Sequence, residues 1–158
     1  MSSPQGLLGV RWGDSPSVAI AKLGVSCPAT GAWEAWEGGG GVTACFDVDH
    51  PVTAFGGSAY VRLFRMDDRI EGMSLRFMGC GVRRDSLREA VRAEFKMPAG
   101  DGDPYQVWPD HALVHLRYDG GDDSCTLVLA GPRFGKPYAA FVLARGLGDL
   151  SKGLRPSH

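Results

Sequence analysis

The chain has 158 residues, and its 17 Lys and Arg against 18 Asp and Glu give a net charge of −1 at pH 7. An apolar fraction of 44% and a charged fraction of 22% are ordinary for one globular domain and exclude a disordered chain. The balanced charge makes nucleic acid or an anionic membrane an unlikely partner, and no run reaches the ~18 apolar residues of a membrane span.

The first half of the chain is expected to hold one helix followed by strands. Ser15 provides an N-cap side chain, Pro16 occupies the first helical position, and Gly24 is the expected C-cap. Apolar residues then alternate with polar ones, which predicts strands whose apolar positions span 42–48, 59–63 and 73–77. Asp67-Asp68 lies between the last two of these and predicts a hairpin.

The second half repeats this order. A helix is expected to begin at Asp85-Ser86, where Ser86 and Glu89 have the spacing of a capping box, and to stop at 97–100. Three further alternating runs predict strands, whose apolar positions span 112–118, 125–129 and 139–143. Residues 131–135 are expected to form a hairpin connection between the last two.

A short repeated sequence motif connects the two halves. Residues 9–15 and 81–86 both contain Gly-Val-Arg and Asp-Ser directly before an expected helix. We therefore predict an α+β fold in which a single domain over 1–158 is built from two repeats, about 7–79 and 80–147, followed by a tail over 148–158. Each repeat would hold one helix and about four antiparallel strands. Both helices would pack on one face of the sheet and leave the other face open.

The four cysteines are Cys27, Cys45, Cys80 and Cys125, which allow three pairings and form no Cys-x-x-Cys motif. One interpretation is two disulfides, most simply Cys27–Cys45 and Cys80–Cys125, in an exported protein whose gene encodes a leader that this chain lacks. The other is a cytoplasmic protein with buried free thiols, since a cysteine packs as a small apolar residue.

The segment that opens at Gly9 and ends at Leu23-Gly24 is similar to a signature of small bacterial envelope proteins, in which a Trp-Gly step leads into a capped short helix. With the helix-then-strands repeat, the chain resembles the beta-lactamase inhibitor protein family and, more distantly, the small outer-membrane-assembly lipoproteins. The resemblance implies an extracytoplasmic binding protein without catalytic activity and one disulfide per repeat. A Cys27–Cys45 pair fits that pattern, whereas Cys80 lies at the junction of the repeats and departs from it.

The candidate binding residues lie on the expected open face and beside a four-glycine loop. Arginines occur on the polar sides of several strands, with aromatic residues alternating alongside, and this mixture is typical of protein interfaces. Two tryptophans before the loop are expected to form an exposed aromatic lip. The predicted partner-binding residues are Trp33, Trp36, Tyr60, Arg62, Phe64, Arg76 and Arg117. The alternatives are a solvated face with internal salt bridges or a surface for single-stranded nucleic acid.

Two further clusters could carry chemistry. Asp47 and Asp49 share one face of an expected strand with His50 just beyond, an arrangement that could hold a metal or serve acid–base catalysis, or could simply end the strand. His111 and His115 lie four apart on an expected strand, which separates them by roughly 13 Å, so one ion cannot bridge them. Both are expected to face solvent.

These observations favour a non-catalytic module that binds another protein, without a metal or cofactor. We expect a periplasmic or secreted envelope accessory subunit or inhibitor. The first alternative is a small metal- or acid/base-dependent enzyme that uses Asp47, Asp49 and His50. The second is an intracellular, cytoplasmic subunit of a larger assembly with reduced cysteines.

Overall fold

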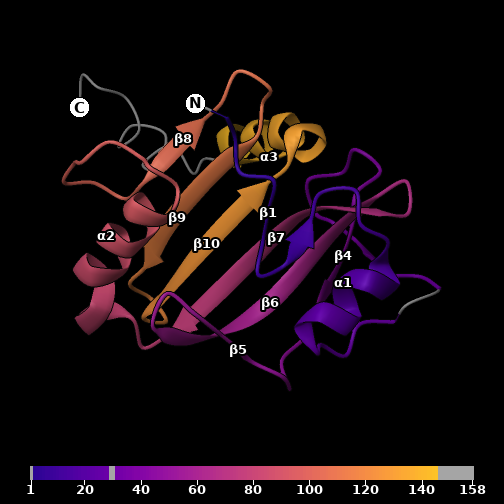
Figure 1. Ribbon diagram of the computed structural model, residues 1–158, viewed down its shortest axis with the longest axis horizontal. Coiled ribbons are helices and arrows are strands. Elements are labelled where there is room, and N and C mark those ends of the chain that lie inside the picture. The colour runs from indigo at the N-terminus through magenta and orange to yellow at the C-terminus, as the bar shows by residue number, and fades with distance from the viewer. Residues whose placement is uncertain (1, 29–30, 146–158) are drawn as a thin grey trace.

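An antiparallel sheet runs through the molecule and carries helices on both of its faces (Figure 1). The computed structural model describes residues 2–28 and 31–145, and the expected tail over 148–158 lies outside them. The helices are α1 (Pro16–Leu23), α2 (Arg84–Glu94), which the 3-10 turn η1 (Gly81–Arg83) precedes, and α3 (Pro132–Ala144). The strands are β1 (Gly6–Leu7), β2 (Val10–Arg11), β3 (Glu34–Ala35), β4 (Thr43–Phe46), β5 (Val52–Ala54), β6 (Gly57–Met66), β7 (Arg69–Met78), β8 (Tyr105–Val107), β9 (Leu113–Asp119) and β10 (Ser124–Ala130). The predicted α+β class is confirmed.

The main sheet has the strand order β3-β4-β6-β7-β10-β9-β8, and every neighbouring pair is antiparallel. Strand β5 pairs with β6 beside this path, while β1 and β2 form a separate ribbon. The hairpin between β6 and β7 turns at Asp67 and Asp68, whose φ angles of 49° and 60° suit the turn of a two-residue hairpin. The predicted hairpin at this position is confirmed.

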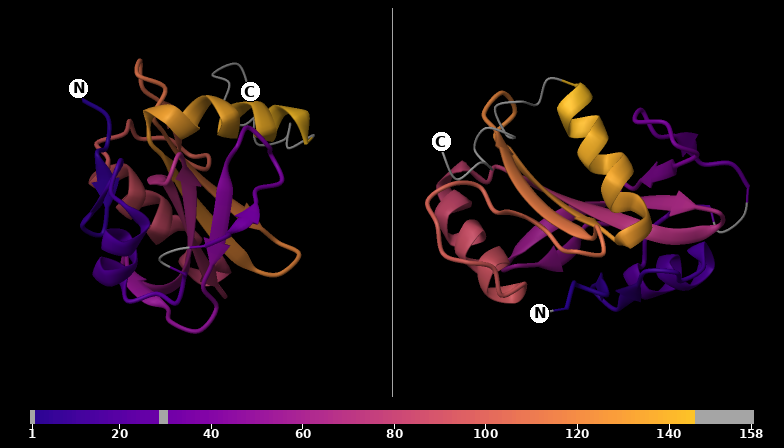
Figure 2. Two further views of the ribbon diagram at one scale, coloured as in Figure 1. Left: turned by 90° about the vertical axis from the view of Figure 1, so that its right-hand side faces the viewer. Right: turned by 90° about the horizontal axis from the view of Figure 1, so that it is seen from above.

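Helices α1 and α2 pack on the same face of the sheet, which we call the α1/α2 face (Figure 2). The α1 prediction is confirmed, because the Ser15 hydroxyl accepts the Val18 amide at 3.4 Å and Gly24 ends the helix with a φ of 70°. Helix α2 also forms, but the predicted capping box is wrong. It begins at Arg84, and the Ser86 hydroxyl donates to the carbonyl of Arg83 instead of capping a free amide.

Helix α3 corrects two predictions. Residues 131–135 do not form a hairpin connection, because they are the N-cap and first turn of α3, and 139–143 lie inside the same helix and do not form a strand. The helix packs on the face opposite α1 and α2, so this face is not fully open (Figure 2). Phe134, Tyr138 and Val142, which follow helical spacing, are the side chains that it buries.

Two glycines allow α3 to lie close to the sheet. The Phe134 ring occupies the place of a side chain on Gly72 of β7, where a Cβ would lie 2.5 Å from the ring. Within α3, a Cβ on Gly135 would lie 1.6 Å from the carbonyl oxygen of His111. A second core forms between α3 and the sheet, and its fully buried aromatic members are Trp36, Phe64, Phe134 and Tyr138.

Both expected disulfides form, Cys27–Cys45 and Cys80–Cys125, and they close loops with sequence separations of 18 and 45. The first ties the segment after α1 to β4, and the second ties the start of η1 to β10. The interpretation with free thiols is therefore wrong. Structural disulfides of this kind are typical of a non-reducing environment.

Candidate functional site

Helix α3 covers only part of its face of the sheet. The remainder, which we call the open sheet surface, forms a hollow of about 430 Å³. Its lining comes from β3, β4, β6, β7, β9 and β10 and consists of Glu34, Ala44, Phe46, Arg62, Ser74, Arg76, Arg117, Asp119, Ser124 and Thr126. Because every strand in this region is paired to its neighbours, the floor of the hollow is a rigid backbone platform.

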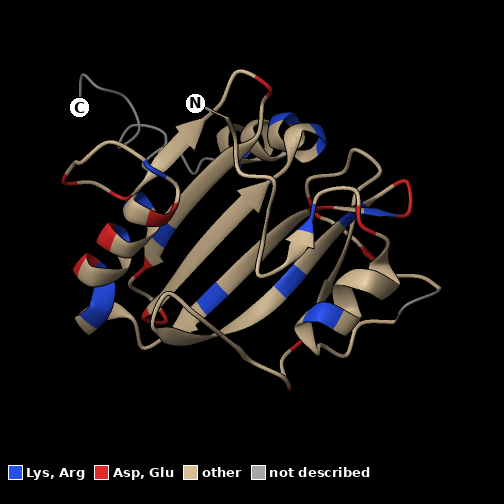
Figure 3. Ribbon diagram, in the orientation of Figure 1, with Lys and Arg blue, Asp and Glu red and all other residues tan. Residues whose placement is uncertain are grey.

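The strand register places the three predicted arginines together on this floor. Arg76 of β7 and Arg117 of β9 lie on either side of Thr126 of β10, and each is its direct cross-strand partner. Arg62 of β6 lies opposite Ser74, two residues from Arg76 on the same face. Figure 3 shows basic positions on β6, β7 and β9 around the uncharged β10. The expectation that these arginines share one face is confirmed, and their role in binding stays a prediction.

The arginines differ in their charge partners. Arg62 holds the carboxylate of Glu37 with both terminal nitrogens, at 3.3 and 3.0 Å, and this contact lowers the pKa of Glu37. Arg76 forms an ion pair with Asp122, and the Ser124 hydroxyl and this guanidinium together lower the pKa of that carboxyl. Both carboxylates are therefore ionised at neutral pH. Within the described residues, Arg117 has no ion-pair partner although it lies half-buried on the floor.

Exposed apolar side chains accompany the arginines. Phe46 lies opposite Arg62 and is 43% exposed, and Met78 lies opposite Ser124 and is 50% exposed. Tyr60 lies opposite Arg76 and is half-buried. Phe46 and Met78 were not among the predicted partner-binding residues. The signal was present, because each lies two residues from another residue of this face, Ala44 or Arg76, and so shares its side of the strand.

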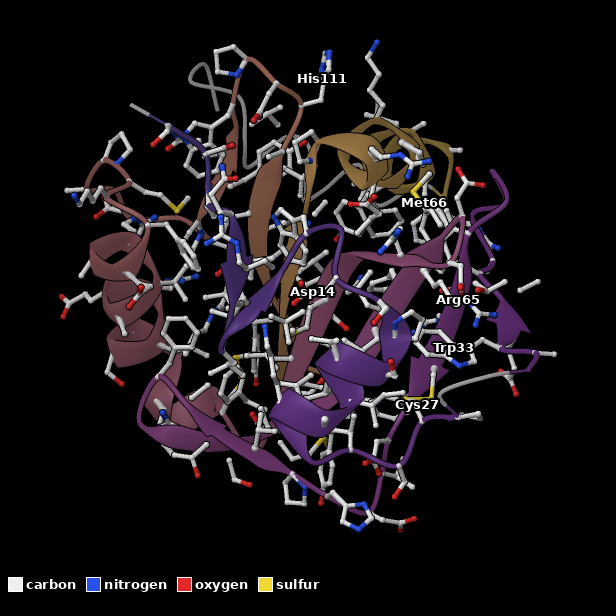
Figure 4. All side chains as sticks on the ribbon, turned by 45° about the vertical axis from the view of Figure 1, so that its right-hand side comes forward. Asp14, Cys27, Trp33, Arg65, Met66 and His111 are labelled. Carbon is white, nitrogen blue, oxygen red and sulfur yellow. A yellow bond between two sulfur atoms is a disulfide. The ribbon has the colours of Figure 1, made fainter. Side chains whose placement is uncertain are left out.

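The other predicted contact aromatics are not on the surface. The exposed lip at Trp33 and Trp36 is wrong, since the two side chains are only 7% and 3% exposed. Trp33 donates its indole N–H to the carbonyl of Pro28 and lies under the Arg65 guanidinium at 4.6 Å (Figure 4). Trp36 packs edge-on against Phe134 under α3. The two indoles are therefore buried in different cores, Trp33 on the α1/α2 face and Trp36 beneath α3.

Phe64 was expected to join the arginines, and this expectation is also wrong. Its ring is 3% exposed and stacks on Phe134 at a centroid separation of 4.6 Å. Phe64 does lie on the same face as Arg62, with the Arg62 guanidinium 5.2 Å from the ring centroid. The strand alternation was therefore interpreted correctly, but α3 covers this end of the strand.

The cluster at Asp47 and His50 holds a turn together. Asp47 follows β4, and its buried carboxylate accepts the amides of Ser26, Asp49 and His50 at 2.7, 2.7 and 3.2 Å. Burial alone would raise its pKa, but these amides and the imidazole outweigh burial and lower it. His50 brings the same nitrogen, Nδ1, near both Ser26 Oγ and Asp47 Oδ2, so the three groups cannot form a relay through the ring. Asp49 does not share a strand face with Asp47, and that expectation is wrong.

His115 is buried, not exposed to solvent as expected. It is 1% exposed beneath α3, with Nδ1 2.9 Å from the Tyr138 hydroxyl and with Nε2 lacking any partner. Burial, and then the nearby Arg117 charge, lower its pKa to about 4. His111 does face solvent, but it lies in a turn with a φ of 75° and not on a strand. Within 2–28 and 31–145, no cluster of His, Cys, Asp or Glu has the arrangement of a metal site.

No known protein family, curated protein or solved structure matches this chain. The resemblance to the beta-lactamase inhibitor protein family therefore stays a prediction. Among the described residues, none of the helices has the length and hydropathy of a membrane span.

Proposed function

We propose that this protein is a non-catalytic binding module whose open sheet surface docks on another protein. The observation that carries the proposal is the composition of that surface. Arginine, aromatic and methionine side chains are enriched at protein interfaces, and here Arg76, Arg117, Phe46, Met78 and Tyr60 gather on one rigid sheet. A platform of this kind loses little conformational entropy when it binds, because its backbone is already fixed.

We further propose that the protein works outside the cytoplasm, as an envelope accessory subunit or an inhibitor. The two disulfides support this location, since such bonds persist where thiols are not kept reduced. They also connect loops to β4 and β10, two strands whose side chains line the hollow. The cross-links would therefore help to hold the surface in its folded shape.

The proposal includes an origin of the fold from two repeats. Its support is the element order, in which α1 precedes β3 to β7 and α2 precedes β8 to β10. The last strands of the two halves, β7 and β10, are neighbours at the centre of the sheet. Among the described residues of the first half, no helix corresponds to α3, which would be an addition to the second repeat.

The test is a capture experiment with matched variants of the full chain. The double variant Phe46→Ser/Met78→Ser removes Phe46, which lines the hollow, and Met78, which lies beside it opposite Ser124. Val82→Ser is the control, because it replaces an apolar residue of η1 that is 96% exposed and outside the hollow. Each protein is immobilised and exposed to an envelope extract of the cells that produce it. We expect a protein that the native chain and Val82→Ser retain and the double variant loses. Equal capture by all three would refute the proposed surface.

A further inference from the structure

We infer that the partner docks an extended acidic segment on the open sheet surface, with one Asp or Glu side chain held between Arg117 and Thr126. This inference rests on the proposed function and specifies the chemistry of its partner. The starting point is the charge pattern of the floor. Three guanidinium groups lie there, and the described part of the chain provides paired carboxylates for only two of them.

The two arginines that form ion pairs indicate what kind of group Arg117 would bind. Glu37 reaches Arg62 through two parallel N–H to oxygen contacts, the fork geometry that a guanidinium makes with a carboxylate. Asp122 pairs with Arg76 through a single nitrogen. Arg117 has the same floor position and a hydroxyl neighbour, Thr126, that can donate a further hydrogen bond. A carboxylate is the ligand that this set of donors fits.

The remaining charges of the hollow favour one carboxylate over a chain of phosphates. Glu34 and Asp119 line the hollow together with the arginines, and Asp119 lies two residues from Arg117 on the same strand face. A nucleic-acid backbone would bring a regular row of negative charges against these carboxylates. A protein segment can place a single acid over Arg117 and a neutral or basic residue over Asp119.

The dimensions set the length of the segment. From Phe46 on β4 to Arg117 on β9 the path crosses four strand spacings, or roughly 19 Å at ~4.8 Å each. About six extended residues at ~3.3 Å each cover this path. The segment would therefore carry an apolar residue that contacts Phe46 at one end and its acid near the other.

The probe is a library of random peptides displayed on phage, selected on the immobilised full chain. We expect the selected peptides to be richer in Asp and Glu than the input library and to carry an aromatic or aliphatic residue about five or six positions from the acid. The best peptide is then synthesised, and its affinity is measured by fluorescence anisotropy. Replacing the acidic residue of the peptide by Gln or Asn should weaken binding about tenfold or more. This comparison uses the native protein throughout.

Charge reversal ties the probe to Arg117. The Arg117→Glu variant should lose the acidic peptide and gain affinity for the peptide whose acid is replaced by Lys. Lys96→Gln, which removes an exposed cation that lies outside the hollow, should bind like the native chain. Circular dichroism of each variant checks that it is folded, and if Arg117→Glu is not, Arg117→Gln takes its place, with loss of the acidic peptide as the expected result.

Three results would overturn the inference. They are a selection without preference for acids, an acidic peptide whose affinity is the same for the native chain and the Arg117 variant, and tighter binding of a single-stranded oligonucleotide than of any peptide. The inference can fail while the proposed function stands. If Phe46→Ser/Met78→Ser abolishes capture of the natural partner but Arg117→Glu does not, the docking surface stands and its acidic ligand is refuted.

Discussion

Acidification is expected to weaken the fold through His115, well above the pH at which carboxylates take up protons. In the folded chain the ring is buried next to Tyr138 and Tyr105, and its Nε2 atom has no hydrogen-bond partner. The protonated ring would carry a positive charge in this buried site, and its Nε2–H group would have no acceptor. Asp103 opposes this effect only in part, so the pKa falls from 6.5 to about 4.

The sign follows from proton uptake. As the pH falls through 6.5 the unfolded chain binds a proton at this ring, whereas the folded chain does so only near pH 4, so acid favours the unfolded state between these values. One unit of pKa corresponds to about 1.36 kcal/mol, and between about pH 7.5 and about pH 5 the free energy of unfolding should fall by about 2 kcal/mol. At pH 5 most Asp and Glu side chains are still ionised, so their contribution is small.

Urea unfolding at the two pH values measures this loss. The His115→Gln variant should lose most of the pH dependence, whatever its stability at neutral pH. His111→Gln, at the exposed histidine of the turn before β9, should keep the native dependence. An NMR titration of the imidazole provides a direct check. An apparent pKa of 6 or above for His115, or an equal pH dependence in the native chain and His115→Gln, would refute the reasoning.

Three other predictions concern stability, each measured by the shift of the urea midpoint. Gly135→Ala should lower the free energy of unfolding by about 3 kcal/mol, because its Cβ would overlap a backbone carbonyl. Gly120→Ala is the control, since its Cβ meets nothing nearer than 3.6 Å, and it should change the free energy of unfolding by less than about 0.5 kcal/mol. Similar shifts in the two variants would contradict the close approach of α3. Asp47→Ala should cost about 2 kcal/mol, since three amides lose their acceptor, and an unchanged midpoint would argue against its structural role. The double variant Cys80→Ser/Cys125→Ser should lose about 4 kcal/mol, the value for a loop of this separation, and a midpoint equal to that of the native chain would contradict it.

Much of the sheet could be predicted because alternation reports which residues share a side of a strand. Arg62, Arg76 and Arg117 were placed together correctly on this basis, since the antiparallel register keeps the two sides distinct across β6, β7, β10 and β9. The first helix could be predicted for a similarly local reason. Its N-cap hydroxyl, first-turn proline and terminal glycine all act within a few residues of the chain.

Helix α3 could not be predicted from the same signals because its local signals conflict. Apolar residues alternate at 139, 141 and 143, and Gly135 and Pro137 both disfavour a helix interior. The opposing signal was the spacing of Phe134, Tyr138 and Val142, but the deciding contacts are distant in sequence. Phe134 packs on Gly72, a residue of another strand, and strand alternation contains no information about this contact.

The candidate surface was predicted in part for the same reason. A strand pattern assigns residues to a side but does not tell how much of that side a helix will cover. Phe64 was therefore expected beside the arginines, although α3 buries it. Phe46 and Met78 are the complementary case, because α3 leaves these two apolar residues of the same face exposed.

The outermost strands of the main sheet are short, with two residues in β3 and three in β8. Such rims offer few free amides and carbonyls to a chain that would extend the ladder, which protects a β-rich protein from associating edge to edge. A ligand that does not pair with an edge strand would bind on the face of the sheet instead. There, side chains and not main-chain hydrogen bonds discriminate between ligands. Selectivity in this molecule can then change by substitution at a handful of positions without any alteration of the backbone.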